Sequence, residues 1–251
     1  MEEAFRLEPS VDESSVVVLY KGGRLPSWHG LSDKDQQAYS NKHIDLMLSI
    51  AQKHWLMTLE GFKLFSSVGN WSRFWTIEFP TFEGAEEWIK SEIEPPYGRY
   101  GYYEYYLSRR LDIGDLNSWI VNPPPPIAIK PIIPGIQPLL KIDRDSVVVI
   151  TFSRWLPDAD IVSPKDRGDN KYIEAMKSVA RKHRLMRLEA YQLIAPQPDW
   201  HHVWITEFPT LKGAEAWMSA ELDSPHSRYT TKSYYLTRKW APEYFAGWIP
   251  R

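Results

Sequence analysis

The stretch from Lys42 to Arg109 decides the fold, because the chain contains it twice. The first copy includes KHIDLMLSIAQKHWLMTLEGF (42–62), WSRFWTIEFPTFEGAEEWI (71–89) and RYGYYEYYLSR (99–109), and the second has KYIEAMKSVARKHRLMRLEAY (171–191), WHHVWITEFPTLKGAEAWM (200–218) and RYTTKSYYLTR (228–238). The spacing between matching residues is constant, so that His54 maps to His183 and Arg99 to Arg228. Roughly 30 of about 68 aligned positions are identical, which indicates a duplicated structural unit.

The pattern within each copy predicts a ferredoxin-like unit. The β-branched run SVVVLY (15–20), repeated as SVVVIT (146–151), predicts a buried strand before each copy. In the first copy we expect a helix over about 33–54, strands over 56–65 and 73–79, a helix from the cap Thr81 to about 93, and a last strand over 99–109. The order βαββαβ places both helices on one face of a four-stranded sheet, so the other face needs a cover.

The duplication divides the chain into four segments. We expect a first ferredoxin-like unit over 14–110, a proline-rich linker over 111–145, a second unit over 146–240 and a C-terminal extension over 241–251. The pairs Trp119-Ile120 and Trp248-Ile249 keep the spacing of the repeat into these tails. We therefore predict that each tail packs onto the other half of the molecule.

Composition narrows the classes of function. The formal net charge is −2, and no basic stripe marks the chain as a nucleic-acid binder. The lack of cysteine excludes disulfides, thiolate metal sites and a cysteine nucleophile. The sequence shows no long apolar run and no signal peptide, so we expect a cytoplasmic protein without a membrane partner. The 12 Trp and 14 Tyr suit an aromatic-lined cavity for a small molecule, and a homodimer of the whole chain stays open.

The element order and pattern just described resemble the dimeric α+β barrel superfamily, in which two ferredoxin-like units pair their open sheet faces around a shared interior. The resemblance implies an α+β fold in which the tandem units form a pseudo-dimeric barrel within one chain. The loop LPSWHGLS (25–32) also resembles a segment of darcynin-like proteins. The superfamily includes cofactor-free monooxygenases, polyketide cyclases, isomerases, dehydratases and haem enzymes, so the fold constrains the function weakly.

We therefore expect a cofactor-independent enzyme that performs proton-transfer chemistry on a small aromatic or polyketide-like molecule in the barrel. The reaction would be a cyclisation, dehydration, isomerisation or oxygenation, with no cofactor and no metal. A non-catalytic ligand-binding or structural protein is one alternative, and a haem protein is another. In the haem alternative the repeated His54 and His183 would be axial ligands, although capping of a helix C-terminus explains both without a ligand.

The predicted catalytic residues are Glu60, Glu189, His29 and Tyr106. Strand alternation places Glu60 and Glu189 on the shared interior, where desolvation would raise a carboxyl pKa and make it a general base. The alternative is that both glutamates pair with Arg99, Arg109 or Lys63 and fix the sheet.

Tyr106 faces the interior from the last strand and could donate to a developing oxyanion or only line the barrel. His29 lies beside Trp28 in a loop and suits proton transfer. His201 and His202 are adjacent on a strand and point oppositely, which argues against zinc. Residues that differ between the halves are better guides than repeated ones, which both halves need in order to fold. The predicted substrate-binding residues are Arg24, Trp28, Phe62, Glu104, Trp155, Arg187, Tyr191 and Tyr235.

Overall fold

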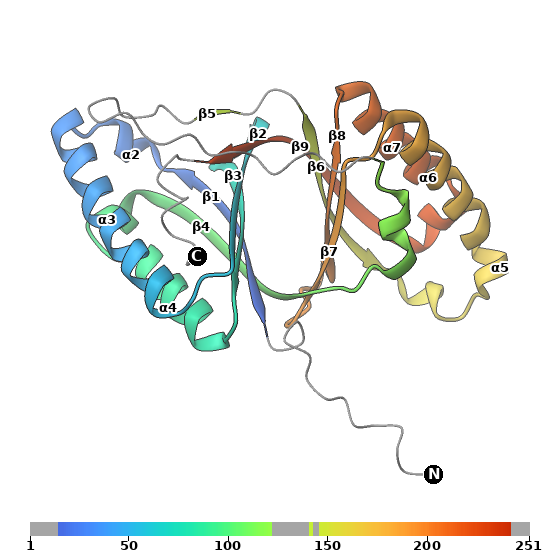
Figure 1. Ribbon diagram of the computed structural model, residues 1–251, viewed down its shortest axis with the longest axis horizontal. Helices are drawn as coiled ribbons and strands as arrows, with labels where there is room; N and C mark the ends of the chain where they lie inside the picture. Colours follow the sequence, from blue (N-terminus) through green and yellow to red (C-terminus); the bar gives the residue numbers. More distant parts are fainter. Residues whose placement is uncertain (1–14, 122–140, 143–145, 242–251) are drawn as a thin grey trace, which may run out of the picture.

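The computed structural model describes residues 15–121, 141–142 and 146–241 (Figure 1). The first half contains β1 (Val16–Arg24), α2 (Pro26–His29), α3 (Asp33–Lys53), β2 (Thr58–Val68), β3 (Trp71–Phe79), α4 (Phe82–Glu92), η1 (Tyr97–Tyr100) and β4 (Gly101–Arg110). The remaining elements are η2 (Gly114–Trp119), β5 (Lys141–Ile142), β6 (Val147–Trp155), η3 (Pro157–Ala159), α5 (Pro164–Arg167), α6 (Asp169–His183), β7 (Arg187–Leu193), β8 (His202–Phe208), α7 (Leu211–Asp223), η4 (Pro225–Tyr229) and β9 (Thr230–Ala241).

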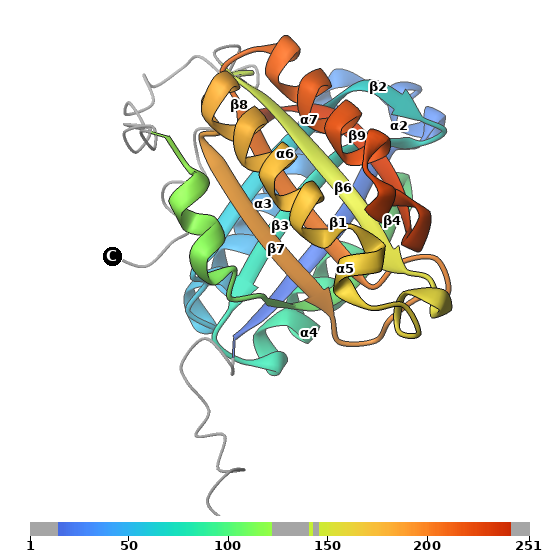
Figure 2. The same ribbon diagram turned by 90° about the vertical axis from the view of Figure 1, so that its right-hand side faces the viewer.

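Eight of the strands close into a barrel. The sheet order is β2-β3-β1-β4-β7-β8-β6-β9-β5, and β9 also pairs with β2. The halves meet at two antiparallel seams, where β4 pairs with β7 from Ser108↔Leu193 onward and β2 pairs with β9 from Phe62↔Lys239 onward. Figure 2 shows the strands crossing behind α6 and α7. The predicted tandem ferredoxin-like α+β barrel is confirmed.

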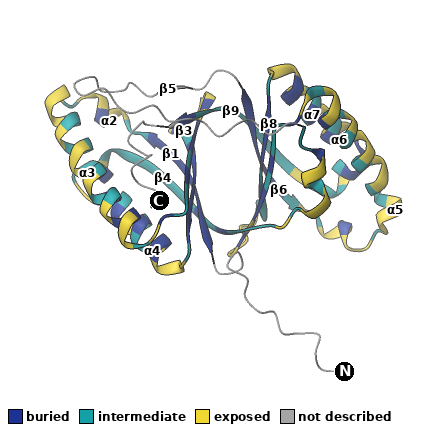
Figure 3. Cartoon of the chain, in the orientation of Figure 1, coloured by how far each residue is buried: buried dark blue, intermediate teal, exposed yellow. Residues whose placement is uncertain are grey.

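Side chains from both halves fill the space between the two sheets. One buried cluster combines Leu19, Phe62 and Phe74 of the first half with Phe152 and Tyr191 of the second. The outer faces of the sheets are covered by α3 and α4 on one side and by α6 and α7 on the other (Figures 1 and 3). The alternation of residues along each strand therefore separates a shared interior from two outer cores.

Local sequence signals set the helix starts. The Ser32 hydroxyl accepts a hydrogen bond from the Asp35 amide at the start of α3, and Thr81 accepts one from the Gly84 amide at the start of α4. In the second half the expected single helix is broken, because Gly168 takes a left-handed conformation with φ of 76° between α5 and α6. Glycine adopts this conformation without the steric penalty of a Cβ atom.

The connections between elements follow the sequence expectations only in part. The first strand is longer than the run SVVVLY (15–20) indicated. β1 continues to Arg24, because it pairs with β4 up to Arg24↔Gly101. The first tail packs onto the second half as predicted, since Trp119 is buried in the second outer core and the Val121 amide donates to the Leu185 carbonyl at 2.8 Å. The proline run 123–126 and Trp248-Ile249 lie outside the described residues.

Candidate functional site

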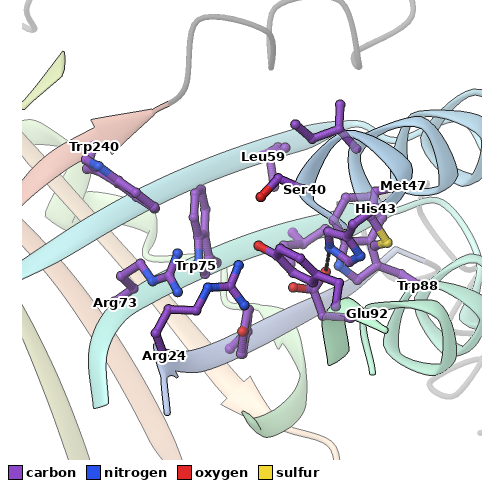
Figure 4. Close-up of a pocket in the computed structure, with 14 residues that line it drawn as sticks. Arg24, Ser40, His43, Met47, Leu59, Arg73, Trp75, Trp88, Glu92 and Trp240 are labelled. Carbon is purple, nitrogen blue, oxygen red and sulfur yellow. Dashed lines mark ion pairs between the residues drawn. The ribbon is translucent and has the colours of Figure 1, made fainter. Parts of the chain in front are cut away.

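A pocket of about 100 Å³ lies on the outer face of the first-half sheet, under α3 (Figure 4). Its polar and aromatic lining comes from several elements: Arg24 from β1, His43 from α3, Arg73 and Trp75 from β3, Glu92 from α4 and Trp240 from β9. Trp240 belongs to the last strand of the second half, so the pocket is built from both halves. It lies outside the barrel, and not in the interior that the sequence analysis favoured.

Two arginines give the pocket its charge. The Arg24 guanidinium lies 3.8 Å from the ring centre of Tyr97 and 4.5 Å from that of Trp28, in the corner formed by these two rings, whose planes are 77° apart. Figure 4 shows Arg73 approaching the same space from the neighbouring strand β3. Neither arginine forms an ion pair with a carboxylate among the described residues. Burial and the nearby charge of Arg73 lower the pKa of Arg24 to about 10.

The carboxylate of the pocket already has a partner. Glu92 Oε2 lies 3.3 Å from His43 Nε2, and the His43 side chain is only 9% exposed. The His43 ring stacks on Tyr97 with centroids 3.9 Å apart and planes 12° apart. Because Glu92 faces His43, the two guanidinium groups have no carboxylate of their own, and the pocket carries excess positive charge.

The second half keeps the same wall without the arginines. At the spacing of the repeat, His43 and Tyr97 become Tyr172 and His226, which stack in reversed roles with centroids 4.4 Å apart. Glu221 takes the place of Glu92 and lies 3.1 Å from Lys232 Nζ. Arg73 corresponds to His202, and Arg24 corresponds to Trp155 when SVVVLY of β1 is aligned with SVVVIT of β6. Only the first-half version therefore combines two arginines with open volume.

Five predicted site residues lie together inside the barrel: Glu60, Phe62, Arg187, Glu189 and Tyr191. Arg187 donates to Glu60 across the two halves at 3.0 Å and to Glu189 at 2.6 Å. Arg110 lies 3.3 Å from Glu189, and the Tyr191 hydroxyl donates to Glu189 at 2.5 Å. Burial alone would raise the pKa of Glu189, but Arg187, Arg110 and Tyr191 together lower it.

This arrangement corrects the expectation of a carboxyl base with a raised pKa, because Glu189 is held ionised by its cations. The glutamates do form ion pairs, as the alternative supposed, but with Arg187 and Arg110 in place of Arg99, Arg109 or Lys63. Arg109 instead donates to the Ser15 carbonyl at 2.6 Å. A cross-half network of this kind fixes the register between the two sheets.

Tyr106, Glu104 and Tyr235 also face the interior, around a lysine that the sequence analysis missed. Lys21 Nζ lies 2.9 Å from Glu104 and 3.0 Å from the Tyr106 hydroxyl. It also lies 4.5 Å from the ring centre of Phe152, which packs against Tyr235. This lysine is 7% exposed. Tyr106 and Glu104 therefore both contact Lys21, which comes from the neighbouring strand β1.

The other predicted residues are separate from these groups. Trp28 packs behind Arg24, whereas His29 is exposed at the end of α2. Trp155 lies beside His226 in the second half, with ring centroids 4.8 Å apart. His54 is the C-cap residue of α3, and its Nε2 contacts Glu87 at 2.5 Å.

His183 is the last residue of α6 and lies at the negative end of the helix dipole. The rings of His201 and His202 lie 6.4 Å apart, and within the described residues no three His, Asp or Glu side chains group as metal ligands. No helix in the described ranges is long and apolar enough to cross a membrane.

Sequence reasoning found Arg24 but missed His43, Arg73, Glu92 and Trp240. The signal was present for three of them, because His43, Arg73 and Trp240 become Tyr172, His202 and Leu111 in the other half. The comparison of the two halves was therefore applied to too few positions to include these three lining residues. Glu92 is repeated as Glu221 and carries no such signal.

Comparison with known proteins shows likeness of structure only. No family model and no curated protein matches the sequence. A mutant chlorite dismutase from Candidatus Nitrospira defluvii matches with a TM-score of 0.63 and 7% identity, covering 93% of this chain and 94% of that chain. The same enzyme in complex with imidazole gives 0.63 and 7%, covering 93% of both chains. The protein TA0507, described provisionally as a chlorite dismutase, gives 0.57 and 12%, covering 94% of this chain and 99% of that chain.

These neighbours correct two expectations. Chlorite dismutases are haem proteins, which contradicts both the expected cofactor-independent proton-transfer enzyme and the expected lack of a cofactor. The cyclase, dehydratase, isomerase and monooxygenase classes receive no support, and the darcynin-like resemblance finds no match. At this level of identity the likeness establishes the architecture alone. The chain has the tandem ferredoxin-like α+β barrel fold of the chlorite dismutases, which belong to the dimeric α+β barrel superfamily.

Proposed function

We propose that this protein binds a small organic anion in the pocket under α3. The observation that carries the proposal is the pair Arg24 and Arg73, which line one pocket without an ion-pair partner among the described carboxylates. Two partly buried like charges repel each other, and the lowered pKa of Arg24 reflects this repulsion together with burial. An anion between them removes the repulsion and satisfies the guanidinium donors.

The rest of the lining suits an apolar body attached to the anionic group. Met47, Leu59 and Trp75 line the pocket on the side of the outer core. Pockets of this kind combine apolar walls with a few polar groups that fix the ligand's orientation. The enclosed volume of about 100 Å³ is smaller than the roughly 150 Å³ that accommodates benzene in an engineered core, but the pocket is partly open to solvent. The ligand is therefore a small carboxylic acid, or a similar anion, with a body no larger than one ring, and part of it projects beyond the enclosed volume.

Haem is the ligand that the likeness to chlorite dismutases suggests, and the pocket provides a test of it. His43 supplies an imidazole, and the arginines supply cations for propionate groups. However, His43 Nε2 faces Glu92, Tyr97 covers the imidazole ring, and the cavity is about 100 Å³ against the several hundred Å³ of pockets for large ligands. The residues as they lie do not fit haem, and we derive no chemistry through it.

Titration calorimetry with benzoate and with benzamide tests the proposal, because the two probes share a ring and differ in charge. We expect benzoate to bind and benzamide to bind at least about tenfold more weakly, as loss of a charged hydrogen bond implies. Arg24→Met and Arg73→Met should each weaken benzoate binding by about 10- to 100-fold.

Arg154→Met is the matched control, because Arg154 lies near the end of the corresponding strand β6 but does not line the pocket. It should leave benzoate affinity unchanged. Equal binding of benzoate and benzamide, or unchanged binding in the Arg24→Met, Arg73→Met double variant, would refute the proposal. A second titration with hemin provides a check on size: a Soret shift that His43→Ala abolishes would show that the pocket opens to admit haem.

A further inference from the structure

One wall of the pocket is a tryptophan of the second half, Trp240, whereas the other lining residues come from the first half. Trp240 is 3% exposed, although it comes from β9, at the end of the other ferredoxin-like unit. Its ring centre lies 4.7 Å from that of Trp75, with planes 54° apart, so the two indoles adjoin at an angle and together form an aromatic wall of the pocket. The Arg73 guanidinium lies 5.4 Å from the Trp240 ring centre. The aromatic wall and the charged group therefore adjoin each other.

Trp240 also brings a polar group that nothing described satisfies. Its buried indole N–H has no hydrogen-bond partner among the residues that the structure describes. Buried donors of this type are normally paired, and leaving one unpaired costs about 1–3 kcal/mol. This donor lies on a residue that lines a cationic pocket, and it is open to an acceptor that the described residues do not supply.

The first half has a glycine, Gly61, where its backbone approaches Trp240. Gly61 lies on β2 directly against Trp240, and a methyl group on it would overlap both the Trp240 carbonyl oxygen and the Trp75 ring. At the spacing of the repeat, the other half has Ala190 in place of Gly61 and Leu111 in place of Trp240. Glycine and tryptophan, one from each half, therefore meet at the seam beside the two arginines.

Resting on the proposed function, we infer that Trp240 is a specificity-determining residue that restricts the ligand to planar aromatic carboxylates. The carboxylate faces Arg24 and Arg73, while the flat ring lies on the wall made by Trp75 and Trp240. A puckered ring of the same size and charge contacts this wall through fewer atoms. Selectivity for a flat body over a puckered one is the property that this arrangement adds to anion binding.

Benzoate and cyclohexanecarboxylate are the probes, since both are monoanions with six-membered rings. We expect the unaltered chain to bind benzoate about 2–10-fold more tightly, the range that one aromatic pair contributes. Trp240→Leu, which introduces the residue of the other half, should bring benzoate down to the level of cyclohexanecarboxylate. The affinity for cyclohexanecarboxylate should stay within about twofold. Trp155→Leu, at an exposed tryptophan of the second half, is the matched control and should preserve the preference.

The outcomes separate the inference from the proposal beneath it. If the unaltered chain binds both acids equally, the inference fails while anion binding stands. If it binds neither acid, anion binding fails as well. The preference of the unaltered chain tests the selectivity, whereas the role of Trp240 needs a variant, and a second variant replaces Trp240→Leu if that one does not fold. In that case Trp240→Phe, which keeps a smaller aromatic face, should retain part of the preference, and a full loss or an undiminished preference would overturn the role of Trp240.

Discussion

Arg24 is the residue on which the proposed anion site mainly rests, and no sequence motif marks it. Its guanidinium lies in the corner between Tyr97 and Trp28, at 3.8 and 4.5 Å from their ring centres, and it has no carboxylate partner in the described part of the chain. A structural arginine in a partly buried position normally has such a partner, because an unpaired charge is costly to desolvate. Arg24 is therefore placed for a charge that comes from a ligand.

The lowered pKa of Arg24 predicts the pH dependence of binding. Benzoate affinity should be constant between about pH 6 and 9, where both the carboxylate and the guanidinium are ionised. Above about pH 10 the affinity should fall, because Arg24 then loses its proton and with it the attraction for the anion. Calorimetry from pH 6 to 11, with circular dichroism to confirm the fold at each pH, measures the profile. The Arg24→Met variant should bind weakly at every pH, and an unchanged affinity at pH 11 in the unaltered chain would contradict this role.

At the scale of residues, the sequence predicted which way side chains face better than what they contact. The alternation along β2 correctly placed Glu60 and Phe62 toward the barrel interior. It could not predict that Arg187 would reach Glu60 from the other half, because the register between the sheets is set by seams far apart in sequence. His43 was missed because its helix face reads as ordinary core, and its replacement by Tyr172 in the other half was overlooked.

At the scale of elements, the seam between β2 and β9 decides whether the pocket exists. It pairs Phe62, Lys63 and Leu64 with Lys239, Arg238 and Thr237. This pairing brings Trp240 over Gly61, where the strands approach too closely for a side chain. The length and order of these strands were predictable from alternation and turns. Their pairing was predictable only from the barrel resemblance, since no local signal specifies a strand's partner across a duplication.

Gly61→Ala should test the close approach at this seam. The added methyl group has no space, so we expect a loss of about 1–3 kcal/mol in the free energy of unfolding, as for other overpacked cores. Benzoate binding should fall with it, because Trp240 must move. Urea denaturation and calorimetry measure the two effects. Gly30→Ala is the control, since its added methyl would meet only the Ser27 carbonyl oxygen at an ordinary 3.6 Å. Equal stability of the two variants would show that the seam has room.

At the scale of the whole molecule, the halves share one interior and cannot be understood separately. Phe152 of the second half packs on Trp71 and Phe74 of the first, with ring centroids 6.3 and 6.0 Å apart. The duplication and the barrel were predictable because a repeated ferredoxin-like unit leaves one bare sheet face in each half. The position of the pocket was not predictable, because the barrel resemblance suggested a site in the interior and not on the outer face.

Glu189→Gln should weaken the cross-half network in a pH-dependent way. The pKa of Glu189 is lower in the folded chain than in the unfolded one, so its contribution is complete above the ordinary glutamate value of about 4.3. We expect a loss of about 1–3 kcal/mol at pH 7. The difference from the unaltered chain should shrink as the pH falls below about 4.3 and through the lowered pKa. Urea denaturation at pH 7 and at pH 3 measures it. Glu215→Gln, at an exposed position of α7, should change little at either pH.

A single gene carrying both halves permits an asymmetry that two identical subunits could not have. In a homodimer every substitution appears in both subunits. A tryptophan at the position of Trp240 would then pack against the strand equivalent to β2 at both seams. The methyl group of Ala190 shows that one of those two sites has not made room for it. Fusion thus allows the two sides to differ, so that a substitution near the C-terminus can change a pocket whose other walls come from the first half.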